Sequence, residues 1–431
     1  MNAIVLGNGR SGKAAAELLR RAGNRVCVLD GNDSWPEGGD WELCVTSPGI
    51  PLDHPWQTAA RAAGVRVVSE LQIGAERFRA MGGRMLAVTG SKGKSSVVKL
   101  VADALDGVPC GNYGLPLCEV VLRCLESRGR LPFAVVEVSS FQMETTELPP
   151  DAFEAAAILN LQEDHLDRHG SIETYHALKL HLLDFASVKI VGTDPSKTGS
   201  DSEENDINGV KSALFEESYF DNPVLRGNGE CAVALMRAAG LGDEAIKSAF
   251  ARFDALPHRM QTVGVFDGVT YIDDSKATSI AALIAGVKMA ISRFERKSQD
   301  VFSFCKKQDP VFEGSVPTEF QGSVPRVRLI AGGLPKGDDP LSARECFAGG
   351  VAKTYLIGQC ALAFADAWQG AVPCEICGTL EAAVAAARRD AADGDCILLS
   401  PGAASFDQFK SYGERGERFA ALSAQPDRFM L

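Results

Sequence analysis

The chain has 431 residues, of which 45% are hydrophobic and 23% charged, and its formal net charge is -12. These values predict a soluble globular protein of two or three domains. They argue against a nucleic-acid or anionic-membrane partner, because no Lys- or Arg-rich face is evident. Without a secretory signal or a long apolar run, we expect a cytoplasmic protein with free thiols, in which the lone C-x-x-C of Cys374 and Cys377 is structural or incidental.

The first 70 residues alternate short apolar strands with helix-like stretches, which predicts a parallel sheet covered by helices. The strands are expected in AIVLGNGRSG (3–12), NRVCVLD (24–30), LCVTSPGI (43–50) and GVRVVSE (64–70). Gly7, Gly9 and Gly12 form a G-x-G-x-x-G loop, and Asp30 closes the next strand. This pattern predicts a diphosphate site for either NAD or a UDP-sugar, and a turn without a ligand is the alternative.

A second α/β unit begins at residue 84 and contains VTGSKGKSS (88–96) between a strand and a helix. The stretch departs from the common phosphate-loop pattern G-x-x-x-x-G-K-[ST], because Val88 stands where a glycine is expected. Its context still favours a phosphate loop over an ordinary turn. We expect Lys94 to reach the transferred phosphate and Ser95 to ligate Mg²⁺. Later elements are predicted as strands at 133–140 and 155–160 and as a helix at 171–186.

A third α/β unit follows LPHRMQ (256–261). Its strands are predicted in GVTYIDDS (268–275), RVRLIAGG (326–333), KTYLIG (353–358) and DCILLSPG (395–402). Two irregular segments interrupt the pattern. The acidic stretch 192–209 is expected to be an exposed loop, and the insert 292–324 is expected to be either mobile or a partner surface.

Six motifs together resemble the Mur ligases, in the order of that family and over nearly the whole chain. They are GNYGLPL (111–117), VEVSSFQMETT (136–146), ILNLQEDHLDRHGSIETYHALKL (158–180), LPHRM (256–260), DDSKATS (273–279) and LLSPGAASFDQFKSYGERG (398–416). Within the family, the combination of the motifs S-S-F-Q-x-E, D-S-K-A-T and S-x-D-Q-F resembles the one found in the ligases that add D-glutamate to UDP-N-acetylmuramoyl-L-alanine.

The resemblance implies an α/β protein of three domains and an ATP-dependent carboxylate–amine ligase of peptidoglycan precursor synthesis. Residues 1–80 would be a Rossmann-like domain for the UDP substrate, and 81–256 a central P-loop domain for ATP. Residues 257–431 would be a Rossmann-like domain that binds the amino acid and closes on ATP. The reaction would pass through an acyl phosphate and use ATP and two Mg²⁺ ions. We expect the protein to be a monomer.

The chemistry and the resemblance together assign the metal ligands. Ser95 and Glu137 suit a first Mg²⁺, which prefers oxygen ligands. His165 and a carbamate on Lys179 would hold a second, and only the resemblance implies these two roles. The ordinary alternatives are a strand-end acid at 137, a helix-start histidine at 165 and a solvated helix lysine at 179.

The remaining expected site residues divide by ligand. The catalytic set is Lys94, Glu137, His165, Lys179 and Lys276. The ATP set is Gly90, Ser91, Lys92, Gly93, Lys94, Ser95, Ser96, Asn228, Arg259 and Asp274. The UDP-substrate set is Gly9, Arg10, Ser11, Asp30, Ser47, Pro48, Gly49, Asn112 and Ser139. The D-glutamate set is Lys276, Thr278, Lys336, Ser405, Phe406 and Tyr412.

The chain also departs from the family pattern. The adenine segment G-x-H-N-x-x-N is reduced to NPVLRGNGECA (222–232), where only Asn228 is retained. Ser279 replaces an asparagine, and Tyr412 stands where phenylalanine is common. The alternatives are a different Mur ligase, a folylpolyglutamate-type ligase, and a nucleotide-binding dehydrogenase or sensor.

Overall fold

A computed structural model describes residues 1–36, 38–127, 131–162, 164–192, 212–216, 218–222, 224–293 and 326–424. Nearly all of the predicted acidic loop and insert therefore lie outside the described residues. The chain divides into two compact units, Met1–Asp221 with Leu225–Phe253, and Asn222–Val224 with Asp254–Leu431. Among the described residues, no helix has the length and apolar character needed to cross a membrane.

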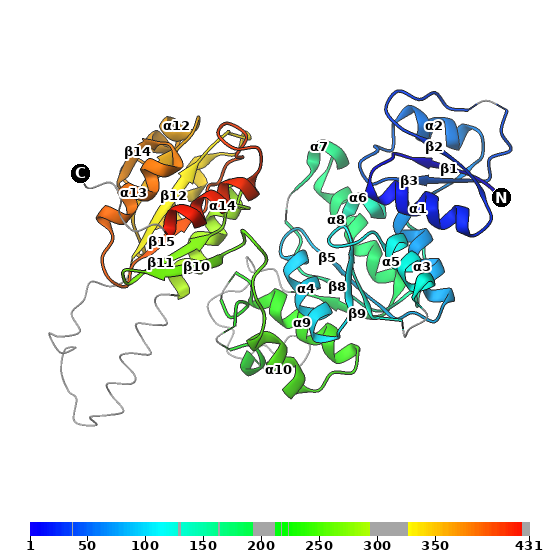
Figure 1. Ribbon diagram of the computed structural model, residues 1–431, viewed down its shortest axis with the longest axis horizontal. Helices are drawn as coiled ribbons and strands as arrows, with labels where there is room; N and C mark the ends of the chain where they lie inside the picture. The colour runs from blue at the N-terminus through cyan, green and yellow to red at the C-terminus, as the bar shows by residue number, and fades with distance from the viewer. Residues whose placement is uncertain are drawn as a thin grey trace. The chain divides into compact units, whose positions relative to one another are not determined.

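The first sheet has the parallel order β2-β1-β3-β4. Its strands are β1 (Asn2–Leu6), β2 (Arg25–Leu29), β3 (Leu43–Thr46) and β4 (Arg66–Ser69), and its helices are α1 (Arg10–Arg21), α2 (Pro55–Ala62) and α3 (Glu70–Ala80) (Figure 1). The strands predicted from sequence are confirmed. A Cβ at Gly12 would lie 1.8 Å from the carbonyl oxygen of Gly7, so only glycine lets α1 start this close to the loop.

The central sheet has the parallel order β6-β7-β5-β8-β9. Its strands are β5 (Met85–Thr89), β6 (Val108–Gly111), β7 (Ala134–Glu137), β8 (Phe153–Ile158) and β9 (Ala186–Val191). Its helices are α4 (Lys94–Ala104), α5 (Leu117–Glu126), α6 (Ser140–Met143), α7 (Leu166–His169), α8 (Ile172–Leu180), α9 (Arg226–Ala238) and α10 (Asp243–Ala251), with 3₁₀ turns η1 (His181–Phe185) and η3 (Ser212–Leu214).

The single helix predicted over 171–186 is wrong in its second half. The α-helix ends at Leu180, a 3₁₀ turn follows, and Ala186 already begins β9. Leu182 and Phe185 are buried in this turn. Their spacing suits a helix and a tight turn equally, and packing against the sheet decides between them.

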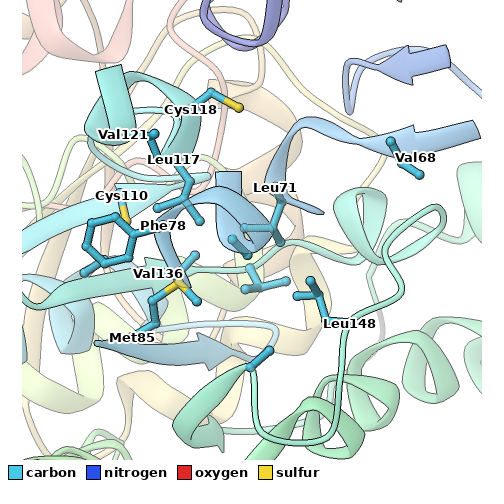
Figure 2. Packing of buried hydrophobic residues seen from close by; sticks show 14 of the residues in the cluster. Val68, Leu71, Phe78, Met85, Cys110, Leu117, Cys118, Val121, Val136 and Leu148 are labelled. Atoms are coloured by element: carbon cyan, nitrogen blue, oxygen red, sulfur yellow. The ribbon is translucent and has the colours of Figure 1, made fainter. Parts of the chain in front are cut away.

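The first and central sheets share one hydrophobic core (Figure 2), which explains why they fall into one compact unit. Helices α3 and α5 carry Phe78, Leu71 and Leu117 into it, and Met85 and Val136 enter from the central sheet. The core therefore fixes the first sheet against the central one.

We expect Phe78→Ala to lower the free energy of unfolding by about 3–5 kcal/mol, because it removes a fully buried ring and leaves a cavity. Urea unfolding followed by circular dichroism measures this. Leu125→Ala is the matched control, since Leu125 lies on α5 but is exposed. Equal losses for both variants would contradict the role given to this core.

The third sheet has the order β10-β11-β15-β12-β13-β14, in which β10 runs antiparallel to β11 and the other neighbouring pairs are parallel. Its strands are β10 (Gln261–Phe266), β11 (Val269–Asp273), β12 (Val327–Gly332), β13 (Val351–Ile357), β14 (Cys374–Gly378) and β15 (Cys396–Leu399). Helix 280–293, η5 (Pro340–Phe347), α12 (Ala361–Trp368), α13 (Leu380–Asp390) and α14 (Tyr412–Ser423) accompany it. The predicted α/β class is confirmed, whereas the domain boundaries at 80/81 and 256/257 stay predictions.

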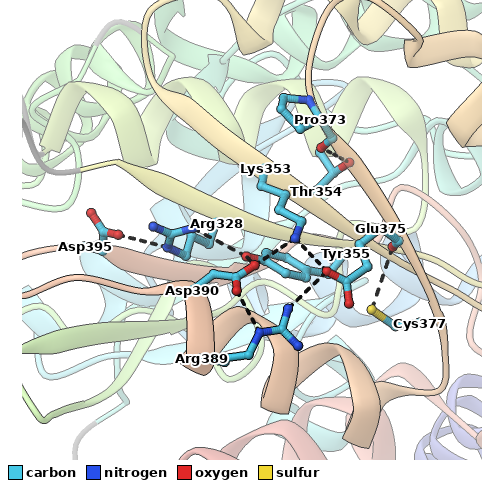
Figure 3. A network of polar contacts seen from close by, with 10 residues as sticks. All are labelled: Arg328, Lys353, Thr354, Tyr355, Pro373, Glu375, Cys377, Arg389, Asp390 and Asp395. Carbon is cyan, nitrogen blue, oxygen red and sulfur yellow. Dashed lines mark hydrogen bonds and ion pairs between the residues drawn. The ribbon is translucent and has the colours of Figure 1, made fainter.

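A polar network ties β13, β14 and the end of α13 together (Figure 3). Lys353 Nζ donates to Glu375 Oε2 at 2.6 Å and to Asp390 Oδ2 at 2.8 Å. Cys374 and Cys377 lie on the same strand, and burial raises the pKa of the Cys377 thiol to about 11. The C-x-x-C thus belongs to the framework of the third sheet, with a thiol that stays protonated near neutral pH.

Candidate functional site

The phosphate loop lies at the carboxyl end of β5, between the neighbouring strands β7 and β8. Gly90 and Gly93 have φ angles of 150° and 85°, which other residues rarely adopt. A Cβ at Gly93 would lie 2.0 Å from Asn228 Nδ2, so α9 closes the loop from one side. The predicted strand–loop–helix is therefore present, with backbone amides at the N-terminus of α4, where anions bind favourably.

Asn228 reaches the loop through Asn160. Asn160 Nδ2 donates to Asn228 Oδ1 at 3.2 Å and to the carbonyl oxygen of Lys92 at 2.9 Å. Asn160 Oδ1 accepts from the amide of Lys92 at 2.9 Å. Asn228 therefore supports the loop through Asn160.

Two lysines meet at one carbonyl of the loop. Lys94 Nζ and Lys179 Nζ each donate to the carbonyl oxygen of Gly90 at 2.8 Å, and Lys94 also donates to that of Ser91 at 3.0 Å. Lys179 is only 2% exposed, and its amine lies 4.6 Å from the ring centre of Tyr175. The alternative of a solvated helix lysine is therefore wrong. Burial, with the nearby Lys94 cation, lowers the pKa of Lys179 to about 7.

The Ser91 hydroxyl is used in hydrogen bonds within the protein. Its hydroxyl donates to the carbonyl oxygen of Gln162 and accepts from the amide of Gln162, both at 2.9 Å, and Tyr175 OH donates to it at 3.1 Å. Its side chain thus holds the loop to the segment after β8. Tyr175 and Gln162 were not singled out from sequence, because nothing local to either residue signals this partner.

Glu137 ends β7 at the same edge of the sheet and is 2% exposed. Its Oε1 accepts from Asn112 Nδ2 at 2.7 Å, whereas its buried Oε2 has no hydrogen-bond partner. An unpaired buried carboxylate oxygen is costly unless a cation or water meets it. The donor set therefore fits a hard cation such as Mg²⁺.

His165 precedes α7 in the left-handed conformation, with φ 53°, and its side chain is 48% exposed. Its ring lies 5.0 Å from that of Phe141. Across the part of the chain that the structure describes, no three His, Cys, Asp or Glu side chains gather as a metal site. A site with Ser95, Glu137, His165 and Lys179 would need the serine hydroxyl and a modified lysine as ligands.

Most of the predicted UDP-substrate residues lie at the carboxyl edge of the first sheet, whereas Asn112 and Ser139 follow β6 and β7 of the central sheet. Asp30 Oδ1 accepts from the amide of Asn8 at 3.4 Å, and Arg10 donates to the carbonyl oxygen of Gly114 at 2.9 Å. Ser47 Oγ is buried without a hydrogen-bond partner. Turn 46–50 and segment 141–145 meet around a narrow gap that has no room for a water molecule.

Ser139 is used within its own helix. Its Oγ accepts from the amide of Gln142 at 3.3 Å, and its own amide donates to Gln142 Oε1 at 2.9 Å, so the two residues form a capping box for α6. The serine orders the turn beside Glu137, and its predicted substrate contact stays a prediction.

In the second unit, Asp274 follows β11 and is buried. Its Oδ1 accepts from the amide of Met260 at 3.2 Å and its Oδ2 from Ser400 Oγ at 2.8 Å. Lys276 Nζ lies 3.8 Å from the ring centre of Tyr412, and Lys336 Nζ donates to Thr278 Oγ1 at 3.1 Å. These contacts bring four of the six predicted D-glutamate residues together in two pairs.

The other members of that set differ in exposure. Ser405 is buried, whereas Phe406 is 69% exposed. Arg415, which was not predicted as a site residue, lies buried beneath them. It donates to Ser275 Oγ at 2.9 Å and to the carbonyl oxygens of Ala403 and Ala404. The sequence feature that could have indicated a role for Arg415 is its place in the motif GERG (413–416).

Burial raises the pKa of the Asp274 carboxyl to about 7, although its hydrogen bonds from Ser400 and Met260 oppose this. Between about pH 4 and about pH 7 the folded carboxyl keeps a proton that an unfolded one has lost. The free energy of unfolding should therefore fall through this window as pH rises, and this contribution should level off above it.

We expect Asp274→Asn to remove this pH dependence. As the pH rises from about 5 to about 8, the urea midpoint of the second unit should fall more in the parent chain than in the variant. Asp366→Asn, at an exposed position of α12, should leave the slope unchanged. Parallel curves for parent and Asp274→Asn would exclude a raised pKa.

The phosphate loop lies on a parallel sheet that follows one α/β sheet in the chain and precedes another. This order is that of the Mur ligases, and residues 88–218 match the Mur ligase middle domain. The chain is 34% identical to UDP-N-acetylmuramoylalanine--D-glutamate ligase of Sphingopyxis alaskensis, with 97% of this chain and 95% of the relative covered. The enzyme of that name from Gloeobacter violaceus is 33% identical, with 97% and 98% covered. The chain belongs to the UDP-N-acetylmuramoylalanine--D-glutamate ligases of the Mur ligase family.

Solved structures share the fold. UDP-N-acetylmuramate-alanine ligase MurC from Thermotoga maritima is 14% identical, with a TM-score of 0.55 and 98% of both chains covered. MurF ligase from Thermotoga maritima in complex with ADP is 13% identical, with a TM-score of 0.53 and 89% of this chain and 94% of that chain covered. These structures show the fold, and the Mur ligase resemblance seen in the sequence motifs is confirmed by the family match and the 33–34% identical relatives.

Proposed function

We propose that this chain is an ATP-dependent carboxylate–amine ligase that joins D-glutamate to UDP-N-acetylmuramoyl-L-alanine in peptidoglycan precursor synthesis. The observation that carries the proposal is the phosphate loop, with the unpaired oxygen of Glu137 and the buried amine of Lys179 at the same sheet edge. The printed names of relatives aligned over nearly their full length support the substrates.

The reaction has two steps. The substrate carboxylate takes the γ-phosphoryl group of ATP and releases ADP, and the D-glutamate amine then attacks the acyl phosphate, losing a proton and displacing phosphate. The loop amides and Lys94 would bind the phosphates and offset the charge that develops during transfer. Asn160 accepts from the amides of Ser91 and Lys92, and the Ser91 hydroxyl bonds to Gln162, so the loop is held in place by the segment after β8.

The residues present also fit the metal. Ser95 and Glu137 would hold one Mg²⁺, and His165 with a carbamate on Lys179 would hold a second. Bound Mg²⁺ would neutralise phosphate charge. A carbamate forms when a neutral amine adds CO₂, and burial favours the neutral form of Lys179.

The second unit would bind the amino acid. Lys276, Lys336 and Thr278 supply donors for the two carboxylates of D-glutamate, and Ser405 lies in the same segment as the exposed Phe406. Arg259 and Asp274 would meet ATP when this domain closes. Closure would exclude water and protect the acyl phosphate. We further propose a cytoplasmic monomer that uses neither a membrane nor a nucleic acid.

The test is phosphate release from ATP by purified protein with Mg²⁺, UDP-N-acetylmuramoyl-L-alanine and D-glutamate. Release should require both acceptors and fall when L-glutamate, L-alanine or a diamino acid replaces D-glutamate. Release with another amino acid would overturn the specificity but keep the ligase. No release from folded protein would leave a nucleotide sensor as the better interpretation, and NADH titration would examine the dehydrogenase alternative.

A further inference from the structure

Arg168 joins three segments of the first unit that are distant in sequence. Its Nε and one terminal nitrogen donate to the two carboxylate oxygens of Glu144 at 3.0 and 2.6 Å. The same terminal nitrogen donates to the carbonyl oxygen of Ile50 at 3.1 Å. Arg168 lies in α7, Glu144 follows α6, and Ile50 closes the turn after β3.

This link is shielded from water. The side chains of Arg168 and Glu144 are 14% and 5% exposed. The guanidinium lies 4.9 Å from the ring centre of Phe141, and the ring of His165 contacts that phenylalanine as well. A bidentate, poorly hydrated pair of this kind is both strong and strict in geometry. Movement of the Arg168 side chain would therefore reach Phe141 directly and the His165 ring through Phe141.

The neighbouring backbone is equally well fixed. The amide of Ser69 donates to the carbonyl oxygen of Thr145 at 2.9 Å, and the hydroxyls of Ser69 and Thr146 are 2.6 Å apart. Glu144 and Ile50 both line the narrow gap where turn 46–50 meets segment 141–145. Arg168 thus joins two residues on opposite sides of this gap, and it lies on the helix that His165 precedes.

We propose that Arg168, oriented by Glu144, is a positioning residue that couples the UDP-binding turn 47–50 to the placement of His165. Loosening the link should weaken uridine binding and cation use together, although Arg168 belongs to neither predicted set of ligand-binding residues. This inference rests on the proposed ligase function, because that function assigns the two sites which the link connects.

Arg168→Lys keeps the charge and most of the stem but loses the planar fork that reaches Glu144 and Ile50 at once. We expect the KM for UDP-N-acetylmuramoyl-L-alanine and the half-saturating Mg²⁺ concentration each to rise about tenfold, since a charged hydrogen bond is lost at each end. The KM for D-glutamate should stay within about twofold, because its site lies in the other unit.

Glu144→Gln should give the same pattern, because the amide holds Arg168 less firmly. The double variant should be no worse than the poorer single variant, since both changes break one link. Calorimetry with UDP alone gives a second readout and should show binding about tenfold weaker in Arg168→Lys. This readout needs no turnover, so it tests the link even if the parent chain releases no phosphate.

Arg84→Lys is the matched control, because Arg84 also forms a bidentate pair, with Glu154, near the start of β5 and β8. It should change neither KM nor UDP binding. Unchanged KM, Mg²⁺ use and UDP binding in Arg168→Lys would overturn the proposal. A fall in kcat alone would also overturn it. So would an equal loss of thermal stability in Arg168→Lys and Arg84→Lys without a change in the KM for the UDP substrate.

Discussion

Glu137→Gln should reduce ligase turnover by on the order of 10³, as expected when a preorganised charge at a phosphoryl-transfer site is lost. The neutral amide keeps the shape of the side chain and an oxygen for Asn112. It cannot supply a carboxylate oxygen to a cation. The loss should therefore appear in kcat and persist at high Mg²⁺.

The same variant should be at least as stable as the parent chain without Mg²⁺. Glu137 Oε2 is buried without a partner, and a neutral buried group costs less than a charged one. Differential scanning fluorimetry should show Mg²⁺ raising the melting temperature of the parent but not of the variant, because ligands stabilise the state that binds them. Glu154→Gln, at the opposite end of the sheet, should leave activity and the Mg²⁺ response intact. A Mg²⁺-induced shift that survives in Glu137→Gln would remove this residue from the cation site.

Much of the fold could be predicted because its signals are local. Buried parallel strands read as short apolar runs, and glycines mark the two loops where backbone must approach an anion closely. The positions of Glu137 and Lys94 followed from the same logic, since parallel strands end at one edge of the sheet. The helix over 171–186 was the exception, because apolar spacing does not distinguish an α-helix from a 3₁₀ turn that packs on a sheet.

The site was less predictable where its contacts are long-range. Nothing near Lys179 in sequence indicates that its amine is buried against Gly90, and composition favours a solvated lysine. The link from Arg168 to Ile50 spans 118 positions of the chain, so no local pattern signals it. No local pattern indicates the hydrogen-bond partners of Ser91 either, because its hydroxyl bonds to Gln162 and Tyr175, which are distant in sequence. Tertiary packing decides each of these cases.

Lys179→Met should abolish detectable ligation, with a loss on the order of 10³ or more, because it removes both the Gly90 contact and the amine that would carry the carbamate. Yet the variant should unfold at a higher temperature than the parent. Methionine fills a similar volume and carries no charge to desolvate in this buried position. Lys94 still donates to Gly90, so the loop keeps one of its two lysine contacts.

The carbamate itself can be observed separately from activity. Protein equilibrated with ¹³C-bicarbonate should show a carbamate carbon signal in its NMR spectrum that Lys179→Met lacks. Lys99→Met is the control, since Lys99 lies on α4 and pairs with Asp103 at the surface. A labelled signal that persists in Lys179→Met would place the modification elsewhere. No signal in the parent chain, together with full ligase activity, would mean that Lys179 acts as an unmodified amine and that its burial serves the phosphate loop through Gly90.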